Sequence, residues 1–368
     1  QIIGSDRVLI RPVEYEEIRS RHAQTLLGPR LSQIRQCVLD LRGNPASGYF
    51  WQEDFLKKYT KLSPLHKISQ LYFITCTALL RRFRWLRRFL RSLEAKILYQ
   101  PIHGDLFEEF NPCLLVLPSL GYFEVDCYLV REARKRNVPT CGIVVNWDHT
   151  VSKGTSGAIP DQALVWGEKM REEVILHHDM RPDAIQITGP AHYDHYFDKK
   201  TYQPREEFCR QHNLDPARPI VLYAGMSPRP YPYNPDVIET LAKICADDRI
   251  EVQPQIFVRL HPNYHQLKFE RPDQWQKESK RFRELKAKYS NLVIEEPEIK
   301  TASTDTFDLT EEDKQVLANT LFHASVVVCF FSTLNLEAAM IDKPVINCCI
   351  YNYRGGESGE ESRVLEFS

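Results

Sequence analysis

The sequence predicts an α/β protein of two domains, each built around a parallel β-sheet. The chain has 368 residues, more than one ordinary core of roughly 100–200 residues would need. Short apolar runs alternate with helical patterns in two series, separated by an irregular stretch at 189–204 that is rich in aromatic residues, proline and charge. Strands alternating with helices form parallel sheets through right-handed crossovers. We therefore predict an N-terminal domain over 1–190 and a C-terminal domain over 191–368, facing each other across a cleft.

The first series follows a mixed segment with a short expected strand at 8–13 and helical patterns up to about residue 96. Its four further expected strands are compact apolar runs at 113–120, 140–147, 163–167 and 185–189. Helical patterns at 125–136 and 168–178 lie between them. A polar loop is expected at 148–157, directly after the second of these runs.

The second series repeats the arrangement. Its expected strands are apolar runs at 219–226, 255–262, 291–296, 325–331 and 344–350. Its expected helices lie near 235–246, 277–289, 311–323 and 333–341. Thr310, with Asp313 three residues later, predicts a cap at the start of the 311–323 helix.

The composition of the chain excludes some classes of binding partner. The 48 basic and 49 acidic side chains balance, whereas coating nucleic acid needs a cationic surplus. No apolar run is long enough to predict a membrane span. The ten cysteines are scattered, with no CxxC pair or zinc spacing, so we expect no structural metal and a reducing, cytoplasmic location.

The segment 77–96 predicts a basic, aromatic, amphipathic helix. Its arginines stand among Leu, Phe and Trp side chains: Arg81, Arg82, Arg84, Arg87, Arg88 and Arg91. Such a helix is suited to an anionic membrane surface, which would make the protein peripheral on the inner face of the plasma membrane. The alternatives are nucleic acid, which the balanced charge disfavours, and a core-packing helix with a solvated arginine face.

In parallel sheets, ligands bind where strands end and helices begin. After the run at 325–331, Ser332 and Thr333 open a helix whose free N–H groups attract phosphate, and Glu337 follows about one turn later. Glu337 is placed to accept hydrogen bonds from sugar hydroxyls. The alternative is that Ser332 is an ordinary N-cap and Glu337 a solvated side chain.

Two more strand ends in the C-terminal domain carry anion-binding types. Arg259, His261 and Pro262 end the run at 255–262. Gly225, near the end of the run at 219–226, permits close backbone approach, and Ser227 follows that run with Arg229 nearby. An imidazole or guanidinium there binds a phosphate oxygen. A locally hydrogen-bonded histidine and a plain turn are the alternatives.

The N-terminal domain offers a candidate base. Asp148 follows a buried strand, in a loop that also holds His149, Ser152 and Lys153. A carboxylate in that position could remove a proton from an acceptor hydroxyl, and Lys153 could hold a phosphate. The alternative is that Asp148 forms an Asx turn.

These motifs resemble the two-Rossmann, GT-B type of glycosyltransferase of bacterial surface-polysaccharide synthesis over roughly 113–350. SxxNLEA with KPVI is similar to the Ser…Glu helix of UDP-N-acetylglucosamine 2-epimerases, which implies phosphate binding by Ser332 and Thr333 and ribose binding by Glu337. RLHP is similar to the His-Pro motif of sialyltransferases, Kdo transferases and CDP-glycerol polymerases. The loop from Trp147 to Gly154 resembles a loop of the CDP-glycerol polymerases that has His where Asp148 stands.

The resemblance implies a glycosyltransferase that uses a CMP- or UDP-linked sugar as substrate, no further cofactor, and a surface-glycan or lipid-linked acceptor. We predict that it is inverting and metal-independent, the latter because the sequence has no acidic metal motif beyond the weak candidate Glu124-x-Asp126, which begins a helix. Asp148 would be the catalytic base, and His261 would stabilise the leaving phosphate. The alternatives are a CDP-glycerol-type polyol-phosphate transferase, a UDP-GlcNAc 2-epimerase-like enzyme, and a non-catalytic assembly module.

Overall fold

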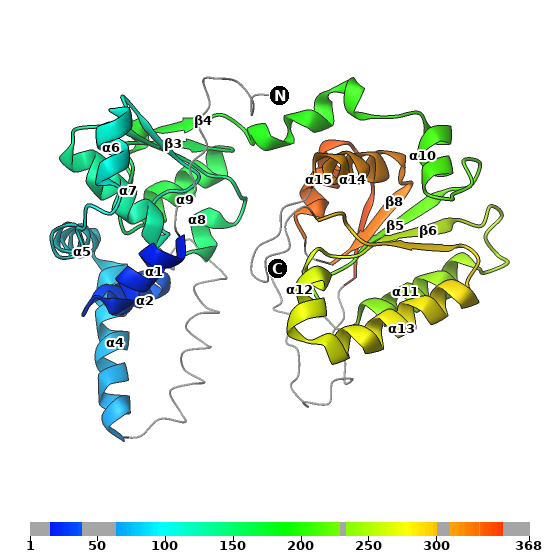
Figure 1. Ribbon diagram of the computed structural model, residues 1–368, viewed down its shortest axis with the longest axis horizontal. Helices are drawn as coiled ribbons and strands as arrows, with labels where there is room; N and C mark the ends of the chain where they lie inside the picture. Colours follow the sequence, from blue (N-terminus) through cyan, green and yellow to red (C-terminus); the bar gives the residue numbers. More distant parts are fainter. Residues whose placement is uncertain (1–14, 39–63, 229–232, 300–309, 331, 349–368) are drawn as a thin grey trace. The chain divides into compact units, whose positions relative to one another are not determined.

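A computed structural model describes residues 15–38, 64–228, 233–299, 310–330 and 332–348. The chain divides into two compact units, unit 1 over residues 1–192 and unit 2 over residues 193–368. The strand expected at 8–13 lies outside the described residues. Each unit contains one parallel sheet (Figure 1).

Unit 1 contains a four-stranded sheet in the order β1-β2-β3-β4. Its strands are β1 (Leu115–Leu117), β2 (Thr140–Ile143), β3 (Gln162–Val165) and β4 (Ile185–Ile187). All neighbours are parallel, with Leu117 beside Gly142 and Gly142 beside Ala163. Crossover helices α7 (Glu124–Lys135) and α9 (Glu168–His178) pack against it. The strands are shorter than the apolar runs, because each run continues into the loop that leaves the sheet.

Five of the described helices of unit 1 precede the sheet. They are α1 (Tyr15–Gln24), α2 (Gly28–Cys37), α4 (Pro64–Arg82), α5 (Arg84–Ile97) and α6 (Gly104–Phe110). The expected single helix at 77–96 is wrong, because the chain is extended at Phe83. Arg87 Nη1 donates to the carbonyl oxygens of Leu80 and Arg81, at 3.1 and 2.9 Å. A side chain of α5 thus satisfies the last turn of α4, which stabilises the break.

Unit 2 contains a five-stranded parallel sheet in the order β7-β6-β5-β8-β9. Its strands are β5 (Ile220–Ala224), β6 (Gln255–Arg259), β7 (Leu292–Glu295), β8 (Val326–Cys329) and β9 (Val345–Asn347). Every residue of β5 and β6 is buried, as expected for strands covered on both faces. The predicted fold class, two Rossmann-like α/β domains with parallel sheets, is confirmed. That they face each other across a cleft stays a prediction.

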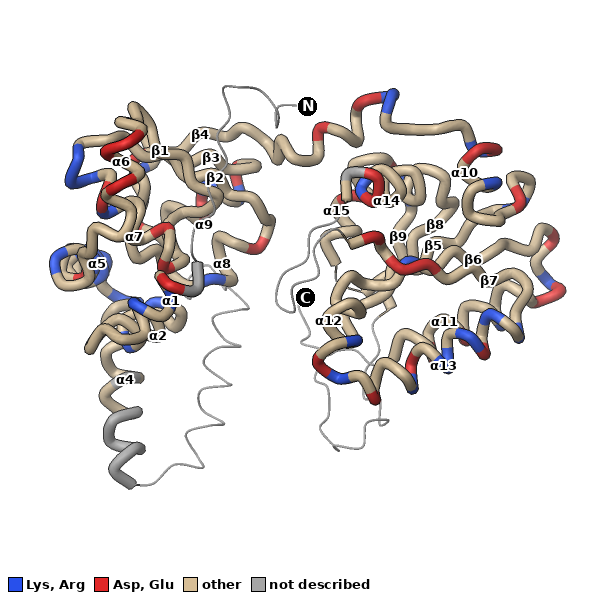
Figure 2. The backbone as a smooth tube through the Cα atoms, in the orientation of Figure 1, with Lys and Arg blue, Asp and Glu red and all other residues tan. Residues whose placement is uncertain are grey.

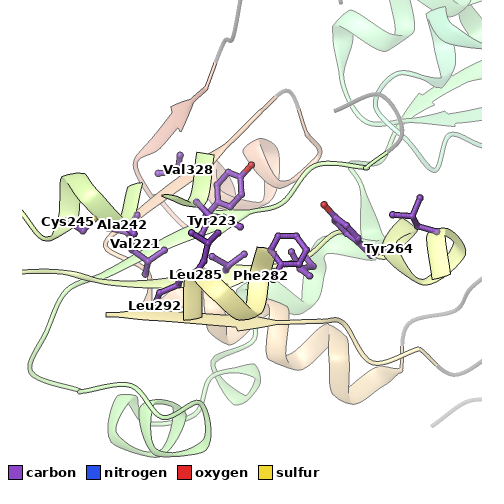
Figure 3. Close-up of a cluster of buried hydrophobic side chains, with 14 residues drawn as sticks. Val221, Tyr223, Ala242, Cys245, Tyr264, Phe282, Leu285, Leu292 and Val328 are labelled. Carbon is purple, nitrogen blue, oxygen red and sulfur yellow. The ribbon is translucent and has the colours of Figure 1, made fainter. Parts of the chain in front are cut away.

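The helices of unit 2 cover both faces of this sheet (Figure 1). They are α10 (Arg205–Gln211), α11 (Asn234–Cys245), α12 (Asn263–Glu270), α13 (Pro272–Lys288), α14 (Glu311–His323) and α15 (Leu334–Met340). Figure 3 shows the core between the sheet and α11 and α13, where Val221, Phe282 and Leu285 meet. The Thr310 hydroxyl accepts from the Asp313 N–H at 3.0 Å, so the predicted cap of α14 is confirmed.

The irregular stretch predicted at 189–204 forms two short 3₁₀ helices, η3 (Ala191–Phe197) and η4 (Lys199–Thr201). Asn319 of α14 accepts from the N–H of Gln203 at 2.8 Å and donates to the carbonyl of Thr201 at 2.9 Å. The later part of this stretch is therefore fixed to unit 2. Among the described residues, no helix combines the length and apolarity that crossing a membrane requires.

Candidate functional site

The candidate base of unit 1 stands at the start of a short helix. The loop expected at 148–157 contains α8 (His149–Ser152), with Asp148 at its N-cap position. The Asp148 carbonyl accepts from the N–H groups of Val151 and Ser152, at 3.0 and 2.8 Å. The Asp148 side chain makes no cap hydrogen bond, so its carboxylate is not used to stabilise the helix.

The loop after β1 and the segment that forms α8 together contain four buried polar side-chain atoms without partners in the part of the chain that the structure describes. Within the described residues, no hydrogen-bond partner reaches Tyr122 Oη, Asp148 Oδ1, His149 Nδ1 or Ser152 Oγ. The rings of Tyr122 and His149 meet edge to face, with centroids 5.6 Å apart. Buried polar atoms without partners are rare and costly, so a group of them indicates a place for a ligand's own donors and acceptors.

Electrostatics also link these residues. Burial, together with the nearby carboxylates of Asp126 and Asp148, raises the pKa of Tyr122. Burial lowers the pKa of His149, although the neighbouring Asp148 opposes this. Tyr122 is therefore a neutral phenol at neutral pH and His149 a neutral imidazole. Both can exchange hydrogen bonds with a sugar hydroxyl without adding charge to the site.

Two glycines let the chain close around α8. Gly121 has φ +71°, and a Cβ there would lie 1.8 Å from the Ala158 carbonyl oxygen. Gly154 has φ +79°, and a Cβ there would lie 2.5 Å from the Arg35 carbonyl oxygen. Only glycine fits such a left-handed backbone at this distance. These contacts hold the loops of the candidate site against each other and against α2.

His178 anchors the far end of the same loop. Its Nδ1 lies 2.8 Å from Ser156 Oγ, and its Nε2 lies 2.9 Å from the Thr150 carbonyl oxygen. Since a carbonyl only accepts, Nε2 carries the proton and Nδ1 accepts. Burial lowers the pKa of His178 to about 4. The neutral ring thus joins α9 to both ends of the segment 150–156.

This burial predicts an acid-sensitive fold. The pKa of His178 falls from 6.5 to about 4 on folding. Between these pH values, the His178 side chain is therefore protonated in the unfolded chain and neutral in the folded chain. The stabilisation is fully present above pH 6.5 and is lost as the pH falls towards 4, by about 3 kcal/mol. Urea unfolding from pH 7 to 4.5 should show a shallower decline for His178→Gln than for wild type or for His192→Gln. Equal declines would contradict the assignment.

In unit 2 the strand order explains why the predicted residues share an edge. Strands β6, β5 and β8 are adjacent, so their carboxyl ends follow one another at roughly 5 Å per strand. The residues that leave these ends are His261, Ser227 and Ser332, respectively. The separate motifs therefore form one row of polar groups at one edge of a single sheet. Arg229 lies outside the described residues.

His261 presents a proton donor. Its Nδ1 accepts from the backbone N–H of Asn263 at 3.0 Å, which assigns the proton to Nε2. Burial lowers the pKa of His261, so the ring is neutral at pH 7. A neutral imidazole with a fixed Nε2–H can donate to a phosphate oxygen without the cost of burying a charge.

Hydrogen bonds connect the ends of β5 and β6. Asn263 Nδ2 donates to Ser227 Oγ at 2.9 Å, and the Gly225 N–H donates to the Arg259 carbonyl at 2.8 Å. A Cβ on Gly225 would lie 3.2 Å from that carbonyl oxygen, so the close approach predicted at Gly225 is to the neighbouring strand. Pro262 holds the N-cap position of α12. Ser227 and His261 are thus both hydrogen-bonded to Asn263 at the start of α12.

Arg259 has a different immediate partner from the predicted phosphate. Its guanidinium is buried and forms an ion pair with Asp313. Asp313 Oδ1 also accepts from the Glu298 N–H at 2.8 Å. The pair joins the end of β6 to the first turn of α14, and the carboxylate offsets the positive charge of Arg259 at the sheet edge.

The segment after β8 begins a short helix. Ser332 Oγ accepts from the Leu334 N–H at 3.3 Å, and Thr333 holds the N-cap position of α15. Glu337 is buried and its Oε2 accepts a hydrogen bond from the Tyr196 hydroxyl. Burial raises the pKa of Glu337, although the Tyr196 hydrogen bond opposes this. Tyr196 comes from η3, so part of the irregular stretch covers this helix.

Sequence reasoning missed three residues that the structure adds to these sites: Tyr122, Asn263 and Tyr196. Tyr122 follows the end of β1 and could have been found by applying the strand-end rule there too. Asn263 and Tyr196 act through contacts that no local pattern indicates. Within the described residues, no three His, Cys, Asp or Glu side chains group as metal ligands would.

Two parallel-sheet α/β units of the Rossmann type, with polar groups at the strand ends, define the class of this protein. No family model and no curated protein matches the chain. Solved structures similar to it include the UDP-GlcNAc 2-epimerase of Neisseria meningitidis bound to UDP-GlcNAc, with 11% identity, a TM-score of 0.44, and coverage of 71% of this chain and 64% of that one.

Two further solved structures are similar at the same level. The UDP-GlcNAc 2-epimerase of Methanocaldococcus jannaschii has 12% identity, a TM-score of 0.43, and coverage of 66% of this chain and 63% of that one. A glycosyltransferase of Rickettsia africae has 12% identity, a TM-score of 0.40, and coverage of 70% and 62%. The chain thus spans less than two thirds of the length of these proteins. Likenesses of this size carry no conclusion about its chemistry.

Proposed function

We propose that the protein is an inverting, metal-independent glycosyltransferase of the GT-B type. It moves a sugar from a CMP- or UDP-linked donor to a surface-glycan or lipid-linked acceptor in polysaccharide biosynthesis of the cell envelope. The observation that carries the proposal is the buried Asp148 Oδ1, which has no hydrogen-bond partner among the described residues; the same holds for Tyr122 Oη, His149 Nδ1 and Ser152 Oγ. These groups match the needs of a sugar hydroxyl that must be held and deprotonated.

In the proposed reaction, unit 1 binds and activates the acceptor. Asp148 removes the proton from the acceptor hydroxyl as its oxygen attacks the anomeric carbon of the donor. Tyr122, His149 and Ser152 hydrogen-bond the neighbouring hydroxyls, and the exposed Lys153 contacts an anionic part of either substrate. The attack inverts the anomeric configuration, because the new C–O bond forms opposite the bond that breaks.

In the proposed reaction, unit 2 binds the nucleotide donor and stabilises its leaving phosphate. The electron pair of the breaking anomeric C–O bond passes to the phosphate, and His261 Nε2–H donates to the oxygen that gains charge. Ser227, Ser332 and Thr333 add neutral donors along the same sheet edge. Tyr196 already holds Glu337 Oε2, so Oε1 is the atom that would accept from ribose. Arg259 supports this edge through Asp313.

Product analysis tests the proposal against its alternatives. The purified chain is incubated with UDP-, CMP- or CDP-linked donors, with and without glycan or lipid-linked acceptors, and products are read by mass spectrometry and NMR. The proposal expects an acceptor-dependent glycoside of inverted configuration. A phosphodiester product would identify the polyol-phosphate transferase, and interconversion of UDP-sugars without acceptor the epimerase. No nucleotide turnover or binding would identify the assembly module.

Activity should survive removal of divalent cations, because the proposed reaction assigns charge stabilisation to His261 and to neutral donors. The expected result is an unchanged initial rate after treatment with EDTA. Loss of activity in EDTA and its return with manganese would contradict the metal-independent part of the proposal.

A lipid-linked acceptor would further require the enzyme to work at a membrane surface.

A further inference from the structure

One face of α5 is fixed to the body of unit 1 by arginines. Arg87 is 2% exposed, and its Nε donates to Asp179 Oδ2 at 2.8 Å. Arg91 Nη2 lies 2.7 Å from the same oxygen, and Arg81 donates to the Cys37 carbonyl from the end of α4. These three arginines are therefore structural, and the prediction that they face a membrane is wrong.

The acidic side chain of α5 is buried as well. Glu94 has no exposed surface and pairs with Arg35 and with Arg131, the latter at 3.0 Å. Asp179 thus pairs with the inward Arg87 and Arg91 of α5, whereas Glu94 pairs with arginines of α2 and α7. No acidic side chain of α5 reaches the outer surface, where it would oppose an anionic partner.

The outward face of α5 is an apolar stripe with basic residues beside it. Its members recur every four residues and are exposed by 66%, 59%, 38% and 47%: Trp85, Phe89, Leu93 and Ile97. Side chains four apart lie on one face of a helix. Arg88 and Lys96 are exposed on the same helix, and Figure 2 shows Lys and Arg along α5.

We propose that this outward face of α5 docks on an anionic lipid bilayer, with the apolar stripe in the headgroup–acyl boundary and Arg88 and Lys96 at lipid phosphates. Large apolar side chains beside cationic ones are suited to such an interface, and the opposite face of the helix is held to unit 1 by the ion pairs of Arg87 and Arg91 with Asp179. A second copy of the chain is a poorer partner. A two-fold contact brings the same patch against itself, which would oppose Arg88 and Lys96 to like charges.

Vesicle flotation of the full chain tests the docking. Wild type should float with phosphatidylcholine–phosphatidylglycerol vesicles and much less with phosphatidylcholine alone. Trp85→Ser with Phe89→Ser should lower the partition coefficient more than about tenfold. Arg88→Gln and Lys96→Gln should each lower it about fivefold. The matched control is Phe269→Ser on α12, where the side chain is 55% exposed, and it should bind as wild type. Circular dichroism confirms folding of every variant.

The docking would be overturned by no wild-type flotation, or by equal flotation of wild type and the Trp85/Phe89 variant. It would equally be overturned by sedimentation showing that the stripe instead joins two copies of the chain. The link to a lipid-linked acceptor rests on the proposed function, but flotation does not. Asp148→Asn should float as wild type even though it is expected to be inactive, so failure of either proposal can be recognised separately.

Discussion

Replacing Asp148 with asparagine should lower kcat of the proposed transfer by about 10²–10⁴-fold, the usual contribution of a general base. Asparagine keeps the shape of the side chain but cannot take a proton at neutral pH. The main-chain hydrogen bonds from Val151 and Ser152 to the residue 148 carbonyl do not involve the side chain, so α8 should persist. Initial rates at saturating donor measure kcat, and KM for the donor should change little.

The matched control is Asp183→Asn, which removes an exposed carboxylate of the same unit, 70% accessible and 3.3 Å from Arg181. It should leave both kcat and KM as in wild type. A kcat for Asp148→Asn within a few-fold of wild type would remove Asp148 as the base. Unfolding or loss of nucleotide binding in that variant would show a structural role instead.

Replacing Asp179 with asparagine should lower the free energy of unfolding by about 3–5 kcal/mol, because the buried Arg87 and the half-buried Arg91 would lose their counter-charge. Burial alone would raise the pKa of Asp179, but hydrogen bonds and charge from Arg87 and Arg91 lower it. Asp179 has φ +60° after α9, and asparagine tolerates that left-handed backbone well. The substitution therefore isolates the charge.

Urea unfolding at pH 7 measures this loss, with Asp183→Asn again as control. The exposed pair of Asp183 with Arg181 should contribute no more than about 1 kcal/mol. Because the network holds α5 in place, vesicle binding of Asp179→Asn should weaken together with stability. Equal stability of Asp179→Asn and wild type would mean that solvent or backbone groups compensate the arginines.

The strands were predictable because each is a short apolar run that stays buried between helices. The helices that connect these strands were predictable from the periodicity of their apolar residues and from their caps, such as the Thr310 cap of α14. The break at Phe83 could not be predicted from local sequence. It depends on Arg87 reaching back to α4 while its other nitrogens bind Asp179, 92 residues away. Short helices of mixed composition, such as α10 and α12, could not be predicted, because their apolar residues show too weak a helical periodicity.

The candidate sites were predictable only as strand ends. The sequence places Asp148, His261 and Ser332 after apolar runs, and parallel sheets gather such ends at one edge. The partners of these residues came from tertiary contacts. Arg259 meets Asp313, 54 residues away, and Glu337 meets Tyr196, 141 residues away. The inward position of Arg87 and Arg91 in the basic segment could not be predicted for the same reason, because hydrophobic patterning alone does not tell which face of an amphipathic helix meets a buried carboxylate such as Asp179.

Calorimetric titration of the full chain with UDP, CDP and CMP tests the central claim that the row of polar groups in unit 2 holds a nucleotide phosphate. Saturable binding of at least one nucleotide is expected, weakened about tenfold or more by His261→Ala, as for a hydrogen bond to a charged group. His265→Ala, one turn further along α12 and 5.1 Å from the Phe269 ring, should bind as wild type. No binding of any nucleotide, or equal affinity of wild type and His261→Ala, would contradict the account.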